Sequence, residues 1–462
     1  GSGFRYHWKG RVMSKFLRLA LIAALTVPAA GCSSTDDIQD AISAINPFGE
    51  SKKPLPGERQ PVMADLSPGQ LAKNKPVVIP GPHAVSTWGG VGGPAGNAAG
   101  HVALDGSGTS RVWSTRAADT GTGGMLRGDV RAFAGPVAAG GRAFVLGPSG
   151  HVTAVSPPGG TAWRVSVRPN DTDEPATTGG VATDGSRVYA GTAYGKMMAL
   201  DADSGAVVWD VKLPEPARSA PTVADGKVLV VTQASTVVAY NAADGAEAWS
   251  WRGTPEIGNL LSSANPAVAN GIAVVPFTSG ELVALDVKSG KPVWNDTLAR
   301  ASRTFAVSGL ATIAASPVIA DGVVYATGVG SRTVAIELKS GARLWDVAFG
   351  SAHTPAVAGN AVFLVDLDDN LTALDRKTGE VLWATHLPVT KTKKKRTHWA
   401  GPVLAGGSLW LVSNEGGMIG ADPTSGRITA TQSGHTPAMV QPIAVSGKIL
   451  VLDASGNLTA YE

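Results

Sequence analysis

One motif, repeated at intervals of about 45 residues, constrains the fold of this chain more than any other feature. It reads Ala-Leu-Asp-x-x-Ser/Thr-Gly-x-x-x-Trp, as in residues 284–294 and 373–383. The repeated tryptophans stand 38 to 51 residues apart, and Ala430 occupies the next equivalent position. They are Trp113, Trp163, Trp209, Trp249, Trp294, Trp345 and Trp383. A chain with this period is built from stacked copies of one structural unit.

The residues around the motif predict that the unit is a small β-sheet. Runs such as 221–231, 317–327 and 402–412 are short and rich in β-branched residues, without a helical stripe. Asp-x-x-Ser/Thr-Gly suits a tight hairpin. The aspartate carboxylate can accept hydrogen bonds from backbone N–H groups in the turn, and glycine readily adopts a positive φ. The tryptophan at a fixed distance is expected to fill the gap between neighbouring sheets. Such sheets bury both faces only by stacking in a closed ring.

Counting repeats predicts eight blades. Seven end at the tryptophans from Trp163 onward and at Ala430, and a partial repeat at 442–461 lacks its last strand. Residues 101–113 contain the final, tryptophan-bearing strand that this partial repeat lacks. The predicted fold is therefore all-β: an eight-bladed β-propeller of four-stranded antiparallel blades over residues 88–462, closed by pairing of the N- and C-terminal strands. The alternative is a seven-bladed ring with a stray strand.

The amino terminus is expected to be a targeting segment. Residues 13–18 carry two basic residues, Lys15 and Arg18, and the apolar run 19–30 is shorter than the roughly 20 residues that span a bilayer. We assign 1–31 as a signal peptide; residues 1–12 precede a plausible start at Met13 and are either added residues or a misassigned start. Ala29-Ala30-Gly31-Cys32 resembles the lipobox of bacterial lipoproteins, although that family usually has Leu at the position of Ala29.

That resemblance implies acylation of Cys32, and Ser33 resembles an outer-membrane sorting pattern. The alternative is an ordinary signal peptide with a chance cysteine. Residues 32–87 are expected to be a lipidated, proline-rich tether, because they contain eight prolines, from Pro47 to Pro82. Part of this tether packing on the domain is the other possibility.

Composition excludes several classes of protein. Cys32 is the one cysteine, which excludes an intramolecular disulfide framework and a cysteine-based zinc cluster. The net charge is +3, but residues 1–31 hold five basic and no acidic residues. Without them, 34 basic residues face 36 acidic ones, so charge gives no argument for nucleic-acid binding.

The repeat resembles that of pyrroloquinoline-quinone (PQQ) propellers, which include quinoprotein dehydrogenases. Those enzymes typically hold PQQ against two adjacent cysteines and bind Ca²⁺ through Glu, Asn and Asp. This propeller has no cysteine, and Asp201, Asp286 and Asp375 recur at turns, which favours turn capping over calcium binding. The histidines at 353, 398 and 435 do not belong to any recognisable catalytic motif. We therefore expect no catalytic residue, no metal and no cofactor.

The second branch of the resemblance is the BamB family, the propeller lipoproteins of the outer-membrane β-barrel assembly machinery. It implies a non-catalytic scaffold that binds the periplasmic POTRA region of a BamA-type subunit and unfolded barrel precursors. Arg218, before Ser-Ala-Pro, resembles one partner-binding feature of that family. Glu256 and Ile257 resemble another, but the acidic pair that follows in the family is replaced by a stretch containing Asn259, Leu260 and Leu261. The alternatives are a solvated loop for Arg218 and core packing for the two leucines.

A basic cluster is the strongest local charge: Lys391, Lys393, Lys394, Lys395 and Arg396. It is interpreted as contacting an anionic lipid surface or acidic partner, and the alternative is a solvated loop. The expected location is the periplasmic face of the outer membrane, held by lipid. A precursor strand that adds to an exposed blade edge is a further hypothesis. The alternative functions are a PQQ-dependent or degenerate quinoprotein dehydrogenase and a periplasmic glycan- or peptide-binding propeller.

Overall fold

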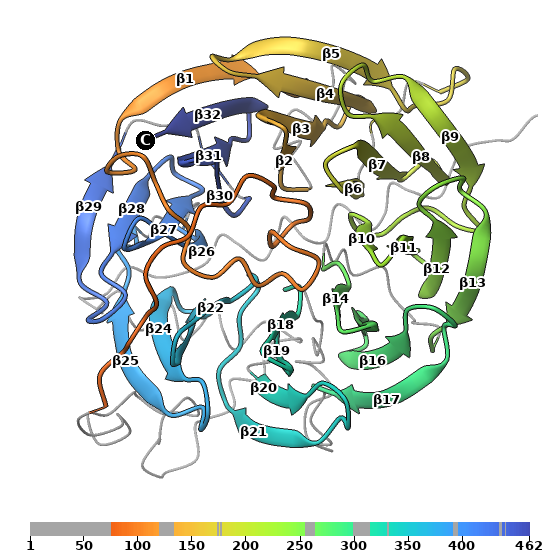
Figure 1. The fold of residues 1–462 in the computed structure, drawn as a ribbon. Coiled ribbons are helices and arrows are strands. Elements are labelled where there is room, and N and C mark those ends of the chain that lie inside the picture. Colours follow the sequence, from red (N-terminus) through yellow and green to blue (C-terminus); the bar gives the residue numbers. More distant parts are fainter. Residues whose placement is uncertain are drawn as a thin grey trace, which may run out of the picture. The chain divides into compact units, whose positions relative to one another are not determined.

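The computed structural model divides the chain into two units, residues 1–65 and 66–462, and every described residue belongs to the second. The structure describes these ranges: 75–119, 134–172, 175, 178–254, 264–298, 315–329, 332–390, 396–433, 437–438 and 440–462. Within them the secondary structure is all-β, with 32 strands. The strands form eight four-stranded sheets arranged in a ring (Figure 1).

Each sheet is one blade, an antiparallel meander whose strands we call A to D from the ring centre outward. Blade 1 consists of β2 (Val137–Ala139), β3 (Arg142–Leu146), β4 (His151–Ser156) and β5 (Gly160–Ser166). Blade 2 consists of β6 (Gly179–Thr183), β7 (Arg187–Thr192), β8 (Lys196–Asp201) and β9 (Val207–Lys212). Blade 3 consists of β10 (Thr222–Ala224), β11 (Lys227–Val231), β12 (Thr236–Asn241) and β13 (Glu247–Arg252). Blade 4 consists of β14 (Ala267–Ala269), β15 (Ile272–Pro276), β16 (Glu281–Asp286) and β17 (Pro292–Thr297).

The second half of the ring repeats this plan. Blade 5 consists of β18 (Val318–Ala320), β19 (Val323–Gly328), β20 (Arg332–Glu337) and β21 (Arg343–Val347). Blade 6 consists of β22 (Ala356–Ala358), β23 (Ala361–Val365), β24 (Asn370–Asp375) and β25 (Val381–His386). Blade 7 consists of β26 (Trp399–Ala405), β27 (Ser408–Ser413), β28 (Met418–Ala421) and β29 (Ile428–Gln432). Blade 8 consists of β30 (Ile443–Val445), β31 (Lys448–Leu452), β32 (Asn457–Tyr461) and β1 (Arg111–Arg116).

Blade 8 joins the two ends of the propeller. Its strand D is β1, which pairs antiparallel with β32, for example Trp113 with Ala460 and Thr115 with Leu458. The predicted closure and the count of eight blades are therefore confirmed, and the seven-bladed alternative is wrong. Because β1 and β32 are far apart in sequence, the ring is closed by backbone hydrogen bonds rather than by a turn.

The repeated tryptophans lock neighbouring blades together. In six blades the strand D indole is largely buried against the next blade, and its Nε1 donates to a backbone carbonyl there. The six donor–acceptor pairs are Trp163–Ala202, Trp209–Ala242, Trp249–Val287, Trp294–Leu338, Trp345–Arg376 and Trp383–Pro423, at 2.7 to 3.0 Å. The prediction that these residues fill the gaps between sheets is confirmed.

The motif glycine lies beneath the tryptophan of the preceding blade. Gly290 has φ +70°, and a Cβ built on it would lie 2.5 Å from the Trp249 ring. The motif therefore needs glycine for two reasons, positive φ and close approach of an aromatic ring. The aspartate of the same motif caps the turn, as predicted: Asp286 Oδ1 accepts from the N–H and hydroxyl of Ser289 at 2.8 and 2.6 Å.

Candidate functional site: the loop face

Blade topology divides the connections between two faces of the ring. The A–B and C–D turns lie on one face, and the B–C turns and the connections between blades lie on the other, which we call the loop face. Arg218 and Arg396 are described and belong to connections between blades, so the topology places these two predicted contact residues on the loop face. The structure tests no contact with a partner, and these assignments remain predictions.

Arg218 lies in the connection between β9 and β10, and it is buried, with 6% of its surface exposed. Its Nη2 donates to the carbonyl oxygen of Pro276 at 2.6 Å, and its Cζ lies 5.7 Å from the centroid of the Phe277 ring. Both partners belong to blade 4. Arg218 thus ties the loop before blade 3 to the next blade, and the alternative that it is a solvated loop arginine is wrong.

Trp251 is a residue that the repeat analysis missed. It lies two positions after the motif tryptophan of β13, is half-buried, and its ring centroid is 5.8 Å from that of Phe277. Arg252 beside it pairs with Glu215 at 3.4 Å, and Glu215 also accepts the hydroxyl of Thr232 at 2.7 Å. A second tryptophan at this position occurs in no other strand D, which was the available sequence signal. Tryptophan and arginine are the residues most often dominant in protein interfaces.

Most of the predicted contact residues lie outside the described ranges. These are Cys32, Glu256, Ile257, Asn259, Leu260, Leu261, Lys391, Lys393, Lys394 and Lys395. His435 lies outside them as well. The bordering residues are described, and Ala264, where the connection to β14 resumes, is buried.

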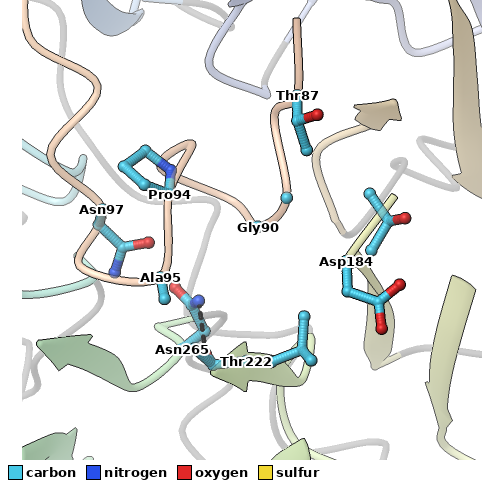
Figure 2. A pocket seen from close by; sticks show the side chains of 11 residues that line it. Thr87, Gly90, Pro94, Ala95, Asn97, Asp184, Thr222 and Asn265 are labelled. Atoms are coloured by element: carbon cyan, nitrogen blue, oxygen red, sulfur yellow. Dashed lines mark hydrogen bonds between the residues drawn. The ribbon is translucent and has the colours of Figure 1, made fainter. Parts of the chain in front are cut away.

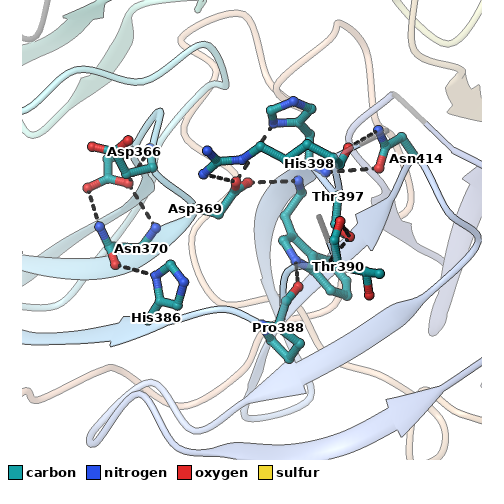
Figure 3. Close-up of polar contacts among 12 residues, drawn as sticks. Asp366, Asp369, Asn370, His386, Pro388, Thr390, Thr397, His398 and Asn414 are labelled. Atoms are coloured by element: carbon teal, nitrogen blue, oxygen red, sulfur yellow. Dashed lines mark hydrogen bonds and ion pairs between the residues drawn. The ribbon is translucent and has the colours of Figure 1, made fainter. Parts of the chain in front are cut away.

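Arg396 is the described member of the basic cluster, and its charge has an internal partner. Its Nη2 lies 3.1 Å from Oδ2 of Asp369, which is 2% exposed (Figure 3). The backbone N–H of Trp399 donates to the same carboxylate at 3.3 Å, and His398 Nδ1 lies 3.7 Å away. Contact of Arg396 with an anionic surface remains a prediction.

The base of the basic connection is held in place by a small ladder of hydrogen bonds. Thr390 N donates to Thr397 Oγ1 at 2.9 Å, and Thr397 N donates to Thr390 O at 3.2 Å (Figure 3). The indole of Trp399 donates to Pro388 O at 2.8 Å. Thr390 and Thr397, which flank the lysines in sequence, are therefore held close together on the loop face.

The opposite face is crossed by residues 76–105, which we call the strap (Figure 1). Its backbone hydrogen-bonds to seven blades at 2.7 to 3.1 Å. Representative pairs are Trp88–Ala138, Gly89–Thr183, Ala95–Val268, Gly96–Ile319, Val78–Asn360, Val102–Gly406 and Asp105–Gly447. Residues 75–87, expected in the tether, thus include segments that pack on the propeller, as the alternative for this region supposed.

A cavity of about 280 Å³ remains between the strap and blades 2 to 4. Figure 2 shows Thr87 and Asn97 on the strap side and Asp184, Thr222 and Asn265 on the ring side. Three of these side chains already have partners: Asn265 Nδ2 donates to Thr222 Oγ1 at 3.0 Å, and Asn97 Nδ2 donates to Pro317 O at 2.9 Å. Burial favours the neutral acid at Asp184, yet the Tyr189 hydroxyl and the Arg187 N–H hold its pKa below the usual value.

The described residues hold no group of three or more His, Cys, Asp or Glu side chains placed to bind a metal ion. Burial lowers the pKa of His353 to about 4, so this imidazole is neutral near pH 7. Hydrogen bonds from Ser204 and Ser289 lower the pKa values of Asp201 and Asp286, consistent with ionised turn caps. The residues around the cavity include no cysteine and one carboxylate, that of Asp184. No helix in the described ranges is long and apolar enough to cross a bilayer.

The fold and its faces define a class: an eight-bladed PQQ-like propeller that carries a strap across one face and its connecting loops on the other. Residues 148–385 match the family model described as outer membrane protein assembly factor BamB. BamB of Yersinia pestis is 29% identical over 286 residues, 62% of this chain and 71% of that protein. BamB of Shigella dysenteriae serotype 1 is 30% identical over 301 residues, 64% of this chain and 75% of that protein. The chain belongs to the BamB family.

Solved structures agree on the fold. BamB from Moraxella catarrhalis superposes with a TM-score of 0.63 at 21% identity, over 76% of this chain and 99% of that one. The quinohemoprotein alcohol dehydrogenase of Comamonas testosteroni gives 0.61 at 16% identity, over 79% and 76%. Both branches of the resemblance thus share the architecture, and the sequence relatives distinguish between them.

Proposed function

We propose that this chain is a non-catalytic scaffold for outer-membrane protein assembly, as the names of its relatives indicate for them. The observation that carries the proposal is the family match over residues 148–385. The propeller supports it physically, because tryptophan locks and the strap make a rigid ring that presents its connecting loops on one face. The quinoprotein alternative has less support, because Cys32 is the one cysteine of the chain and the propeller cannot supply the two adjacent cysteines that a PQQ site typically has.

The partner surface is proposed to be the loop face around Arg218. Arg218, Phe277 and Trp251 form a contiguous group of aromatic and cationic side chains from two consecutive blades. In the sequence, residues 256–261 fall in the connection between those blades. A BamA-type subunit, through its POTRA region, is the proposed partner. The four lysines of the basic cluster are proposed to contact anionic lipid or an acidic partner.

The anchor and location complete the proposal. Cys32 is proposed to carry the acyl chains, with residues 1–31 removed as a signal peptide and the residues after Cys32 forming the tether. The propeller, residues 88–462 with the preceding strap residues, would then lie at the periplasmic face of the outer membrane. Mass spectrometry of the mature amino terminus tests this assignment, and an unmodified Cys32 would contradict it.

The test of the scaffold is affinity purification of the full chain from gently solubilised membranes. The expected result is co-purification of an outer-membrane barrel subunit with POTRA repeats, and its loss in Arg218→Glu. Lys288→Glu is the matched control, because Lys288 is exposed in a C–D turn on the strap face. Because Arg218 is buried, Trp251→Ser provides a second variant, and thermal unfolding of each variant separates lost binding from lost folding. Recovery of the wild-type chain without that subunit would overturn the proposal.

A further inference from the structure

Trp113 is the exception among the seven motif tryptophans. The other six donate Nε1–H to a carbonyl oxygen in the C–D turn of the next blade, for example Trp163 to Ala202 at 3.0 Å. Trp113 is 9% exposed, and its Nε1 is buried without a hydrogen-bond partner among the described residues. Because an unpaired buried donor is unfavourable, a ligand that brings an acceptor to this group gains a hydrogen bond that the fold itself does not supply.

The residue in the position of the usual acceptor is Pro157. It is the first residue after β4, as Ala202 is the first residue after β8. In place of a bonded carbonyl there is a pocket of about 40 Å³, lined by both Trp113 and Pro157, between blades 8 and 1 on the strap face. Pro157 is exposed, so the pocket can be reached from solvent. Its volume holds roughly three water-sized groups, which is about the size of a carboxylate.

The lining determines which kind of group suits the pocket. Its floor is apolar and includes the buried residues Val155 and Leu450. Among the described residues that line it, two are cations, Arg142 and Lys448, and none is an acid. Both cations pair with carboxylates outside the pocket, whose side chains are 44% to 84% exposed. Exposed ion pairs contribute little to stability, so both cations are available to another anion.

We propose that this pocket binds a small aliphatic carboxylate. One carboxylate oxygen accepts the indole N–H of Trp113, in the place that a carbonyl oxygen holds at the six regular junctions. The negative charge lies beside Arg142 and Lys448, and the aliphatic part contacts the apolar floor. Short free carboxylic acids and the acidic side chain of a partner protein share this chemistry. The site lies on the face opposite the proposed partner surface, and it does not depend on the proposed assembly function.

The test follows the indole N–H of Trp113 by ¹H–¹⁵N NMR of the full-length chain with labelled tryptophan. Trp113→Phe identifies the signal by its loss. Sodium propionate is the probe, and propionamide, which has a similar shape and no charge, is the matched control at equal ionic strength. The signal should shift saturably with propionate, and binding of propionamide should be at least about fivefold weaker. The signal of Trp249, which already donates to Val287 O, should stay in place.

A pair of arginines tests the role of the cations. Arg142 is the first residue of β3, and Arg187 is the first residue of β7, where its guanidinium donates to the carbonyls of Ala242 and Ala243. Arg142→Met should weaken propionate binding at least about threefold, whereas Arg187→Met should change it less than about twofold.

The peptide acetyl-Gly-Glu-Gly-amide distinguishes the two sources of the carboxylate. Tighter binding than propionate assigns the pocket to an acidic side chain of a partner, and weaker binding assigns it to a free acid. The two titrations of the wild-type chain decide the proposal even if a variant folds poorly. A Trp113 signal that does not shift saturably with propionate, or that shifts equally with propionamide, overturns it.

Discussion

Six junctions between blades are built alike, and the two on either side of blade 8 are not. At the regular junctions an indole packs on a motif glycine and donates to a carbonyl of the next blade. Between blades 7 and 8, Ala430 stands at the position that tryptophan occupies in the other blades. Between blades 8 and 1, Trp113 is buried, but its Nε1 has no hydrogen-bond partner. The ring therefore repeats one lock until it reaches the blade that closes it.

The reason lies in the turns that face these residues. The regular lock needs a four-residue C–D turn that contributes the carbonyl and the glycine. Blade 8 has no C–D turn, since β32 and β1 come from opposite ends of the propeller. In blade 1 the turn after Ser156 is one residue shorter, and Gly159 would place a Cβ 3.4 Å from Trp113. The comparison shows that the ring is closed at blade 8 by strand pairing and by the strap. The other junctions are held by the packing and hydrogen bond of the tryptophan indole.

The largest expected difference is between two tryptophan deletions. Trp249→Ala should lower the free energy of unfolding by about 3–5 kcal/mol, because it leaves a cavity and an unpaired carbonyl of Val287. Trp113→Ala should cost about 1 kcal/mol less, because no hydrogen bond is lost. Urea unfolding followed by circular dichroism measures both. Equal losses would show that the indole hydrogen bond contributes nothing to the regular lock.

A pair of glycines separates backbone strain from the clash with the lock. Gly290 and Gly271 have φ values of +70° and +73°, but a Cβ on Gly271 meets nothing within 4 Å. Gly271→Ala should cost about 1–2 kcal/mol for the left-handed conformation alone. Gly290→Ala should cost about 1–3 kcal/mol more, because the new methyl collides with the Trp249 ring. Thermal unfolding of the two variants is the measurement, and similar losses would mean that the ring moves aside freely.

Hydrogen exchange tests whether closure is the weaker region. Amides of β1 and β32 should exchange at least about tenfold faster than those of β12 and β13, because strands at the junction without the lock open first. Mass spectrometry of peptides from the two blades gives the rates. Equal protection in both blades would show that the strap fully compensates for the missing locks.

The smallest expected effect is electrostatic. Lys448 Nζ lies 3.0 Å from Glu462 and 3.4 Å from Asp105, so it links the strap to the residue that follows β32. The hydrogen bond to Glu462 raises the pKa of Lys448. Its stabilising contribution is therefore complete below the ordinary lysine value of 10.5 and is lost as the pH rises through the raised pKa.

Lys448→Met should reduce stability by less than about 1 kcal/mol, and the loss should shrink at high salt. Lys196, which pairs with Asp210 at 2.8 Å inside blade 2, is the control. If Lys196→Met produces the same change in the exchange of β1 as Lys448→Met, the ion pairs have no specific role in closure.

The sequence alone determined the architecture of this protein. A motif with a fixed spacing between aspartate, glycine and tryptophan is local, so it could be counted, and its count predicted eight blades and their closure. The aspartate caps followed from turn chemistry that acts within four residues. The family resemblance also rested on these repeated residues, and the family match over 148–385 confirmed it.

Only the tertiary structure decided how the irregular parts are used. Residues 76–105 lack the repeat, and their hydrogen bonds go to seven blades that are distant in sequence. The burial of Arg218 depends on Pro276 and Phe277, and the pairing of Arg396 depends on Asp369. A sequence motif records contacts between near neighbours, whereas these contacts depend on which blades the ring brings together.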